Sequence, residues 1–335
     1  MKTAKTDLVR LGRISALIGG IVWLVLLLPL SNWLNLPVES SGETWLIERL
    51  LMLAGLAFVP LALSLVATPD ENGQHCFAYR CAISFQPLGA VLVVVSFFLR
   101  TSLATASLTL AWILVTLLIA LFGLWRLWRR WKTTGSILPL EELCVDAGLA
   151  YVVVGSGWLF LSRAGMNPME FSDNIVLLTA VHFHYAGFAA PILTGLAGRK
   201  LRAGIARKIY LAAATGIIAG PPLVAAGITL SRAVEVFSAV TLALSLFTLA
   251  MLTMFLIAPT MKPLPRLLLI LSAMSVVVTM IFACLYAFGR FAGIETVGIP
   301  LMAQVHGISN ALGFVLCGLL AWTTAGTDQA TTEQG

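Results

Sequence analysis

Residues 103–124 read LATASLTLAWILVTLLIALFGL, a stretch without a single charged side chain. A helix rises about 1.5 Å per residue and needs roughly 20 apolar residues to cross the hydrocarbon core of a bilayer. The sequence WRLWRRWK follows at 125–132, where tryptophans alternate with basic residues, as is typical of a helix end at a membrane surface. The stretch therefore predicts a transmembrane helix that ends in a membrane anchor.

The same pattern recurs along the whole chain. Of its 335 residues, 59% are hydrophobic and 11% are charged, against roughly 25% charged residues in an average soluble domain. The fold class is therefore all-α, a polytopic transmembrane bundle in a single integral membrane domain. We expect ten helices, at residues 12–30, 45–66, 83–99, 103–124, 143–162, 174–198, 207–230, 234–257, 267–289 and 299–322, followed by a disordered tail at 323–335.

Basic residues alternate strongly between the two sides of this ten-helix arrangement. Sixteen of the 21 Lys and Arg residues fall on the side of the N-terminus. Because cytoplasmic loops are enriched in Lys and Arg, both termini are expected in the cytoplasm, with the chain in a cytoplasmic (inner) membrane. The first apolar run lacks a cleavage motif and is too long for a signal peptide, so we read it as a helix. The net charge of +6 indicates contact with anionic lipid and not with nucleic acid.

The cysteines and the motif content limit the chemistry. Five cysteines, of which several are expected on the cytoplasmic side, imply no disulfide framework. His75, Cys76 and Cys81 match no standard zinc spacing. No phosphate-binding loop or nucleophile elbow is present, which leaves open whether the protein is an enzyme. Two groups of five helices would have the inverted topology of many transporters, although the two halves share no convincing similarity.

The seventh expected helix carries the segment Gly220-Pro221-Pro222 in its middle. Two consecutive prolines remove two backbone donors and clash with the preceding turn. We expect the helix to be kinked or unwound there. A broken helix at membrane depth is typical of a transport site, and a purely structural kink is equally compatible with the sequence.

Three of the four histidines lie inside expected helices: His182, His184 and His306. His182 and His306 are expected about 12 Å and about 10 Å below the outer ends of their helices, so they could share one layer. His182 and His184 are two residues apart, about 200° around a helix, and cannot both bind one ion from regular geometry.

Helical spacing assigns the three histidines different surroundings. Thr179, His182 and Tyr185 recur every three residues and predict a polar ridge that lines a cavity. His184 shares its face with small residues and is expected to hydrogen-bond a neighbouring helix. Asn310 lies one turn from His306 and is expected to orient its ring.

Charged residues also occur near the outer ends of the expected helices. Glu48 and Glu235 are the acidic residues considered as partners for the histidine layer. The others, Arg49 and Arg163 among them, are expected to be solvated or to extend toward the interface. Polar residues of this kind also occur as simple helix-to-helix contacts, which is the alternative to a functional site.

Two segments carry a resemblance to a known family. HFHYAGF at 182–188, followed late in the chain by HGISNALGF at 306–314, resembles the YndJ-like family of bacterial membrane proteins. The resemblance implies a polytopic membrane fold; members are sometimes labelled transporters, and the family provides no catalytic residues to carry over.

Three functions fit these observations. The first is a transporter or permease-like protein for an unknown small solute, with titratable His182 and His306 allowing proton coupling. The second is a haem- or transition-metal-binding protein with a redox role, in which His182 and His306 are ligands from two helices. The third is a structural membrane component. The expected partners are the lipid bilayer and a small-molecule substrate; the sequence gives no oligomeric state.

Overall fold

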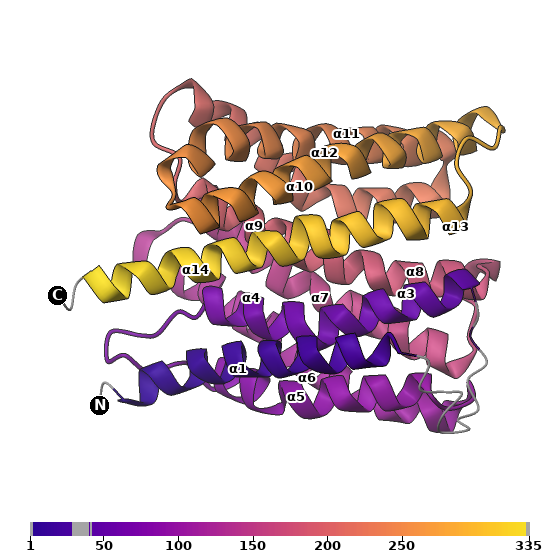
Figure 1. Cartoon of the computed structure of the whole chain (residues 1–335), viewed down its shortest axis with the longest axis horizontal. Coiled ribbons are helices and arrows are strands. Elements are labelled where there is room, and N and C mark those ends of the chain that lie inside the picture. The colour runs from indigo at the N-terminus through magenta and orange to yellow at the C-terminus, as the bar shows by residue number, and fades with distance from the viewer. Residues whose placement is uncertain (1–2, 29–39, 41, 333–335) are drawn as a thin grey trace. The chain divides into compact units, whose positions relative to one another are not determined.

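The computed structural model of the chain describes residues 3–28, 40 and 42–332 and consists of helices joined by short connections (Figure 1). Within the described residues, ten helical runs are long and apolar enough to cross a membrane, as the sequence predicts. The helical elements are α1 (Thr3–Leu26), α3 (Gly42–Leu53) with η1 (Ala54–Phe58) and α4 (Val59–Leu65), α5 (Phe77–Phe97), α6 (Leu103–Thr134), α7 (Leu140–Ala164), η2 (Pro168–Glu170), α8 (Asp173–His182) with η3 (Phe183–Ala189) and α9 (Ala190–Gly198), α10 (Ile205–Leu230), α11 (Arg232–Leu252) with η4 (Thr253–Ile257) and η5 (Ala258–Thr260), α12 (Pro263–Ala292), and α13 (Ile299–Leu301) with η6 (Met302–Gly307), η7 (Ser309–Leu316) and α14 (Cys317–Thr332).

Of the described helices, α6 and α14 extend furthest beyond their expected C-terminal ends. α6 continues past Leu124 through the tryptophan- and arginine-rich segment and ends at Gly135, whose φ of 68° closes the helix in the left-handed conformation. α14 continues to Thr332, so the described part of the tail expected to be disordered is helical. The end of the first expected helix, at 29–30, lies outside the described residues.

The chain contains two compact units, and the single integral membrane domain that the sequence predicts stays a prediction. Unit 1 comprises Met1–Gly135 and Asp146–Ala189, and unit 2 comprises Ser136–Val145 and Ala190–Gly335. One boundary follows Gly135 in the connection between α6 and α7, and the other two fall inside α7 and at the end of η3, within continuous helical segments. Apolar helices with short joints contain no linker signal, and the sequence therefore could not indicate this division.

In unit 1, α1 packs along η1 and α4, and α5 packs along α6 (Figure 1). Gly19 makes the first contact possible, because a methyl group at this position would overlap the backbone carbonyl of Leu56. Small residues of this kind allow helix backbones to approach closely inside a membrane.

In unit 2, α10, α11 and α12 pack in sequence (Figure 1). The unwinding expected at Gly220-Pro221-Pro222 is not observed, since α10 is helical from Ile205 to Leu230. Gly220 instead lies against α11, where an added methyl group would come within 2.7 Å of Leu242 Cδ1. The segment is a close-packing site between helices, and a membrane helix can tolerate internal proline when neighbouring structure supports it.

Irregular turns occur elsewhere, as π-helical segments at η1, η3, η4, η6 and η7. A π-turn widens the helix and frequently marks a functional position. Neighbouring side chains satisfy carbonyl groups in two of these segments. Gln86 Nε2 donates to Gly55 O in η1 at 2.7 Å, and Ser272 Oγ donates to Phe314 O in η7 at 2.8 Å. The two histidine-bearing segments that resemble the family are both π-helical.

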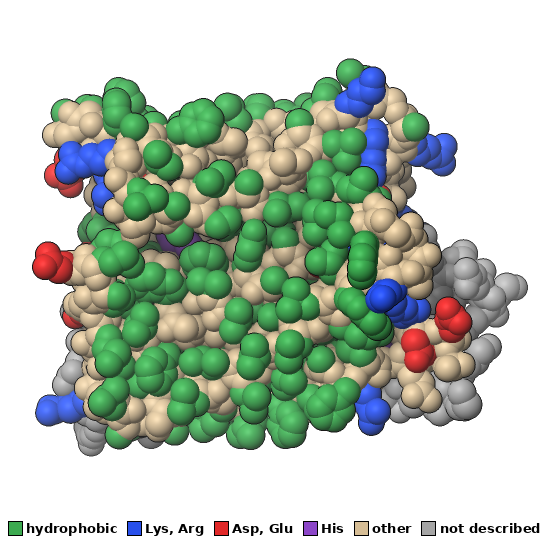
Figure 2. Space-filling view, turned by 180° about the vertical axis from the view of Figure 1, so that it is seen from behind, with side chains coloured by type: hydrophobic (Ala, Val, Ile, Leu, Met, Phe, Trp, Pro, Cys, Tyr) green, Lys and Arg blue, Asp and Glu red, His purple; other side chains and the backbone are tan. Residues whose placement is uncertain are grey.

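Apolar side chains cover the lengths of the helices, and most charged side chains lie toward their ends (Figure 2). Large hydrophobic residues that are more than half exposed occur on helices of both units, for example Leu114, Phe255 and Ile281. Such a surface is compatible with lipid as its solvent.

Candidate functional site

His182 ends α8 and is exposed, although it lies within an apolar helical run. Its Nδ1 is 2.7 Å from the carbonyl oxygen of Leu178, one turn earlier. Because a carbonyl only accepts hydrogen bonds, Nδ1 carries the proton and Nε2 is the nitrogen directed away from the helix. Nε2 makes no hydrogen bond to any residue that the structure describes. The ring can therefore gain or lose a proton at Nε2.

The prediction that Thr179, His182 and Tyr185 form one polar ridge is wrong for Tyr185. The π-turn that starts at Phe183 changes the rotation per residue, and Tyr185 turns into the core of unit 1. Its hydroxyl donates to Leu50 O at 2.9 Å, and its ring packs edge-on against Phe58 with centroids 5.5 Å apart. Thr179 Oγ1 donates to Ile175 O in its own helix. Neither residue shares the exposure of His182.

His184 has the structural role that the sequence predicts. It is fully buried, its Nδ1 donates to Ala180 O at 2.8 Å, and its Nε2 accepts from Trp112 Nε1 in α6 at 3.1 Å. With one nitrogen donating and the other accepting, the ring is neutral. Gly155 in α7 provides the space, because a methyl group there would come within 2.6 Å of His184 Nδ1. His184 thus joins three helical segments of unit 1.

His306 belongs to a polar cluster in unit 2 that is shared with α12. Its Nδ1 is 2.9 Å from Thr279 O, and the Thr279 hydroxyl donates to Asn310 Oδ1 at 3.0 Å. Thr279 therefore links His306 to Asn310. Asn310, which was expected to orient the His306 ring, reaches it through Thr279. As at His182, the contact to a carbonyl places the proton on Nδ1. His182 and His306 lie in different units, and their meeting in one layer stays a prediction.

Glu235 and Glu48 have different surroundings. Glu235, in the first turn of α11, is 6% exposed and its Oε1 lies 3.2 Å from Arg290 Nε. It forms an ion pair between α11 and α12. Glu48, in α3, is 5% exposed, and its Oε2 lies 4.0 Å from Arg49 Nη1 without a hydrogen bond.

Arg49 and Arg163 are not solvated, contrary to the sequence-based expectation. Their exposed fractions are 4% and 7%. Arg49 Nε donates to Leu26 O at the end of α1, and Arg163 Nη2 donates to Leu99 O after α5. Each guanidinium also lies over an aromatic ring, 5.5 Å from Phe98 for Arg49 and 5.0 Å from Phe97 for Arg163. Aromatic and carbonyl partners replace water around these cations.

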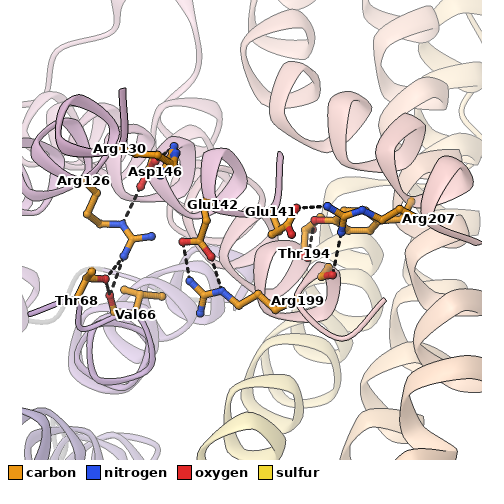
Figure 3. Close-up of polar contacts among 12 residues, drawn as sticks. Val66, Thr68, Arg126, Arg130, Glu141, Glu142, Asp146, Thr194, Arg199 and Arg207 are labelled. Carbon is orange, nitrogen blue, oxygen red and sulfur yellow. Dashed lines mark hydrogen bonds and ion pairs between the residues drawn. The ribbon is translucent and has the colours of Figure 1, made fainter. Parts of the chain in front are cut away.

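Sequence reasoning missed an ionic cluster in unit 1 around Asp146 (Figure 3). The Asp146 carboxylate accepts from Arg126 Nε at 2.8 Å and from Arg130. Arg126 also donates to Val66 O and to the hydroxyl of Thr68. Arginines that were interpreted as a membrane anchor thus bind α7 and the segment after α4. The signal that could have shown it is an aspartate inside the fifth apolar run.

Two further ion pairs of unit 2 involve the start of α7 (Figure 3). Arg199 contacts Glu142 through both carboxylate oxygens, at 2.7 and 2.9 Å, and Arg207 pairs with Glu141. These pairs connect the start of α7 to the segment after α9 and to α10. They are more exposed than the Asp146 cluster, and we assign them a structural role.

No group of three metal-binding side chains forms among the residues described. Cys76, ahead of α5, is half-buried, and its burial raises the pKa of the thiol above the ordinary value. The structure thus offers no third ligand to the proposed pairing of His182 and His306 with a metal.

The ten apolar helices of the described residues, with their apolar exposed surfaces and buried ionisable groups, define a multi-pass membrane protein. The chain belongs to the YndJ-like protein family, whose sequence model matches residues 49–314. It is similar to a protein of Bacillus subtilis (strain 168) described as "Uncharacterized membrane protein YndJ", with 32% identity over 275 residues, which are 82% of this chain and 48% of that protein. The chain thus spans about half the length of this relative. No solved structure matches the chain.

Proposed function

We propose that the protein is a transporter or permease-like protein for a small solute, with His182 and His306 as its proton-binding histidines. The exposed imidazole of His182 carries this proposal. An ionisable side chain within an apolar helix is costly against lipid and usually faces a protein cavity or a water-filled path. The neighbouring His184, which is buried and doubly hydrogen-bonded, shows how a purely structural histidine is accommodated in the same segment.

Proton coupling follows from the chemistry of the two rings. In each ring, Nδ1 lies at hydrogen-bonding distance from a backbone carbonyl, and at His182 this leaves Nε2 as the nitrogen that takes up a proton. His182 is the last residue of α8, directly before the π-turn at η3, and His306 lies within the π-turn at η6. The Gly220-Pro221-Pro222 segment is left out of the proposed path, because it packs against α11 in an unbroken helix.

Flux in proteoliposomes tests the proposal. Candidate solutes are supplied under an imposed pH gradient, and His182→Ala and His306→Ala are compared with wild type and with His184→Ala. We expect gradient-driven uptake to be lost in the first two variants while their thermal stability is retained. His184→Ala should lower stability. Gradient-driven uptake that survives the double substitution of His182 and His306 would refute proton coupling through these residues.

A further inference from the structure

The two buried glutamates of the membrane helices have similar exposure but different ionic partners. The Oε1 atom of Glu235 lies 3.2 Å from Arg290 Nε, a distance expected of a charged pair. In Glu48, Oε2 is buried, makes no hydrogen bond, and lies 4.0 Å from Arg49 Nη1. A carboxylate that needed Arg49 as its counter-ion would be expected at hydrogen-bonding distance from it.

Arg49 is held in place by groups other than Glu48. Its Nε donates to Leu26 O at 3.0 Å, and its guanidinium lies 5.1 Å from the centre of the Trp45 ring. Its backbone carbonyl accepts from Trp23 Nε1 at 2.7 Å. These contacts fix the guanidinium at the end of α1, and Glu48 is not required to hold it there.

The surroundings of Glu48 contain few charges. Arg49 on α3, Arg163 at the end of α7 and the nearby hydroxyl of Ser40 are the groups that favour its charged form, while burial favours the neutral acid. Ser40 Oγ is also buried without a hydrogen bond. α8, which packs against α3, contributes Asp173 and His182 as its titratable groups and places neutral Asn174 against Thr44 at the start of α3. η1 contains no titratable residue, and the titratable residues of α1 and α5, which also pack against α3, lie in the first halves of these two helices.

We propose that Glu48 is a proton-binding carboxyl that is neutral at pH 7 and that ionises by closing the gap to Arg49. An ionised carboxylate that is buried without hydrogen bonds is far more costly than the neutral acid. A shift of about 1 Å would bring Arg49 Nη1 into a charge-assisted hydrogen bond, which is the state that the ionised form requires. The carboxyl thus has two arrangements that differ by one proton.

A role for this proton in solute movement rests on the proposed function. There Glu48 would be a third proton-binding group, in the same unit as His182. The protonation of Glu48 itself does not depend on transport, because it follows from the contacts of α3.

Infrared spectroscopy of the full chain in lipid nanodiscs tests the proposal through the C=O stretching band of a protonated carboxylic acid. We expect this band at pH 7 in wild type, its loss in Glu48→Gln, and its persistence in the matched variant Glu235→Gln. The wild-type band should disappear reversibly as the pH rises.

A wild-type protein without a protonated carboxyl band at pH 7 would overturn the proposal, whatever the folding of the variants. So would a band that Glu48→Gln leaves unchanged. Because no solute is involved, absent flux in proteoliposomes would count against the transporter and leave this result intact.

Discussion

Replacement of Asp146 by Asn should destabilise unit 1 strongly. The Asp146 carboxylate is 3% exposed and accepts from Arg126, also 3% exposed, and from Arg130, 12% exposed. Asparagine keeps the shape and removes the charge, so that the Arg126 cation is left with the neutral oxygens of Val66 and Thr68. Loss of one partner from a buried ion pair costs about 3–5 kcal/mol.

Glu142→Gln is the matched control at the start of the same helix. Its partner Arg199 is 33% exposed and Glu142 itself is 23% exposed, so solvent screens the pair. A pair of this exposure contributes about 0–1 kcal/mol. Unfolding of the purified protein in mixed micelles, followed by circular dichroism against the mole fraction of SDS, gives both changes in the free energy of unfolding. Equal losses in the two variants, or a loss below about 1 kcal/mol in Asp146→Asn, would refute the assignment of Asp146 as a buried ionic centre.

Three further predictions concern packing, pH and orientation. Gly19→Ala should lower stability by about 1–3 kcal/mol, because the new methyl group overlaps the Leu56 carbonyl. Gly20→Ala should leave stability unchanged, because no atom lies within 4 Å of its new methyl group. Thermal unfolding compares the two variants. Burial raises the pKa of the Cys76 thiol. In a variant that retains only Cys76, the rate of alkylation should therefore rise with pH through a midpoint above the ordinary thiol value of about 8.5. The midpoint should return to the ordinary value when the protein is denatured. An impermeant maleimide applied to spheroplasts should label Ile294→Cys and not Thr133→Cys, two exposed positions on opposite sides of the predicted topology; the reverse labelling would invert the predicted orientation.

The sequence was sufficient to predict the helices because the membrane demands long apolar runs, and residues 103–124 satisfy that demand without any tertiary information. It was also sufficient to separate His184 from His182, since two residues on a helix point in nearly opposite directions. It could not predict the fate of Tyr185, because the π-turn at Phe183 depends on packing against α3.

Prolines and arginines were misread for a related reason. Pro221 and Pro222 lack donors, which predicts a kinked or unwound helix, but α10 is not unwound there, and Gly220 packs against Leu242 of α11. Arg126 and Arg130 lie in a run whose composition resembles an interfacial anchor, and only the fold brings Asp146 next to them. The composition of a segment indicates which environment its residues prefer. The partner that pairs with a charged residue such as Arg126 comes from another helix, which only the fold shows.

Cross-linking of positions 182 and 306 tests most directly whether the two histidines act together. In a cysteine-free background, His182→Cys with His306→Cys is treated with a short bifunctional thiol reagent, and the chain is then cut between the two positions. We predict that the two fragments stay joined on a denaturing gel, while the control pair His184→Cys with His306→Cys separates because position 184 is buried against Trp112. Fragments that separate equally in both pairs would contradict the prediction that His182 and His306 share one layer.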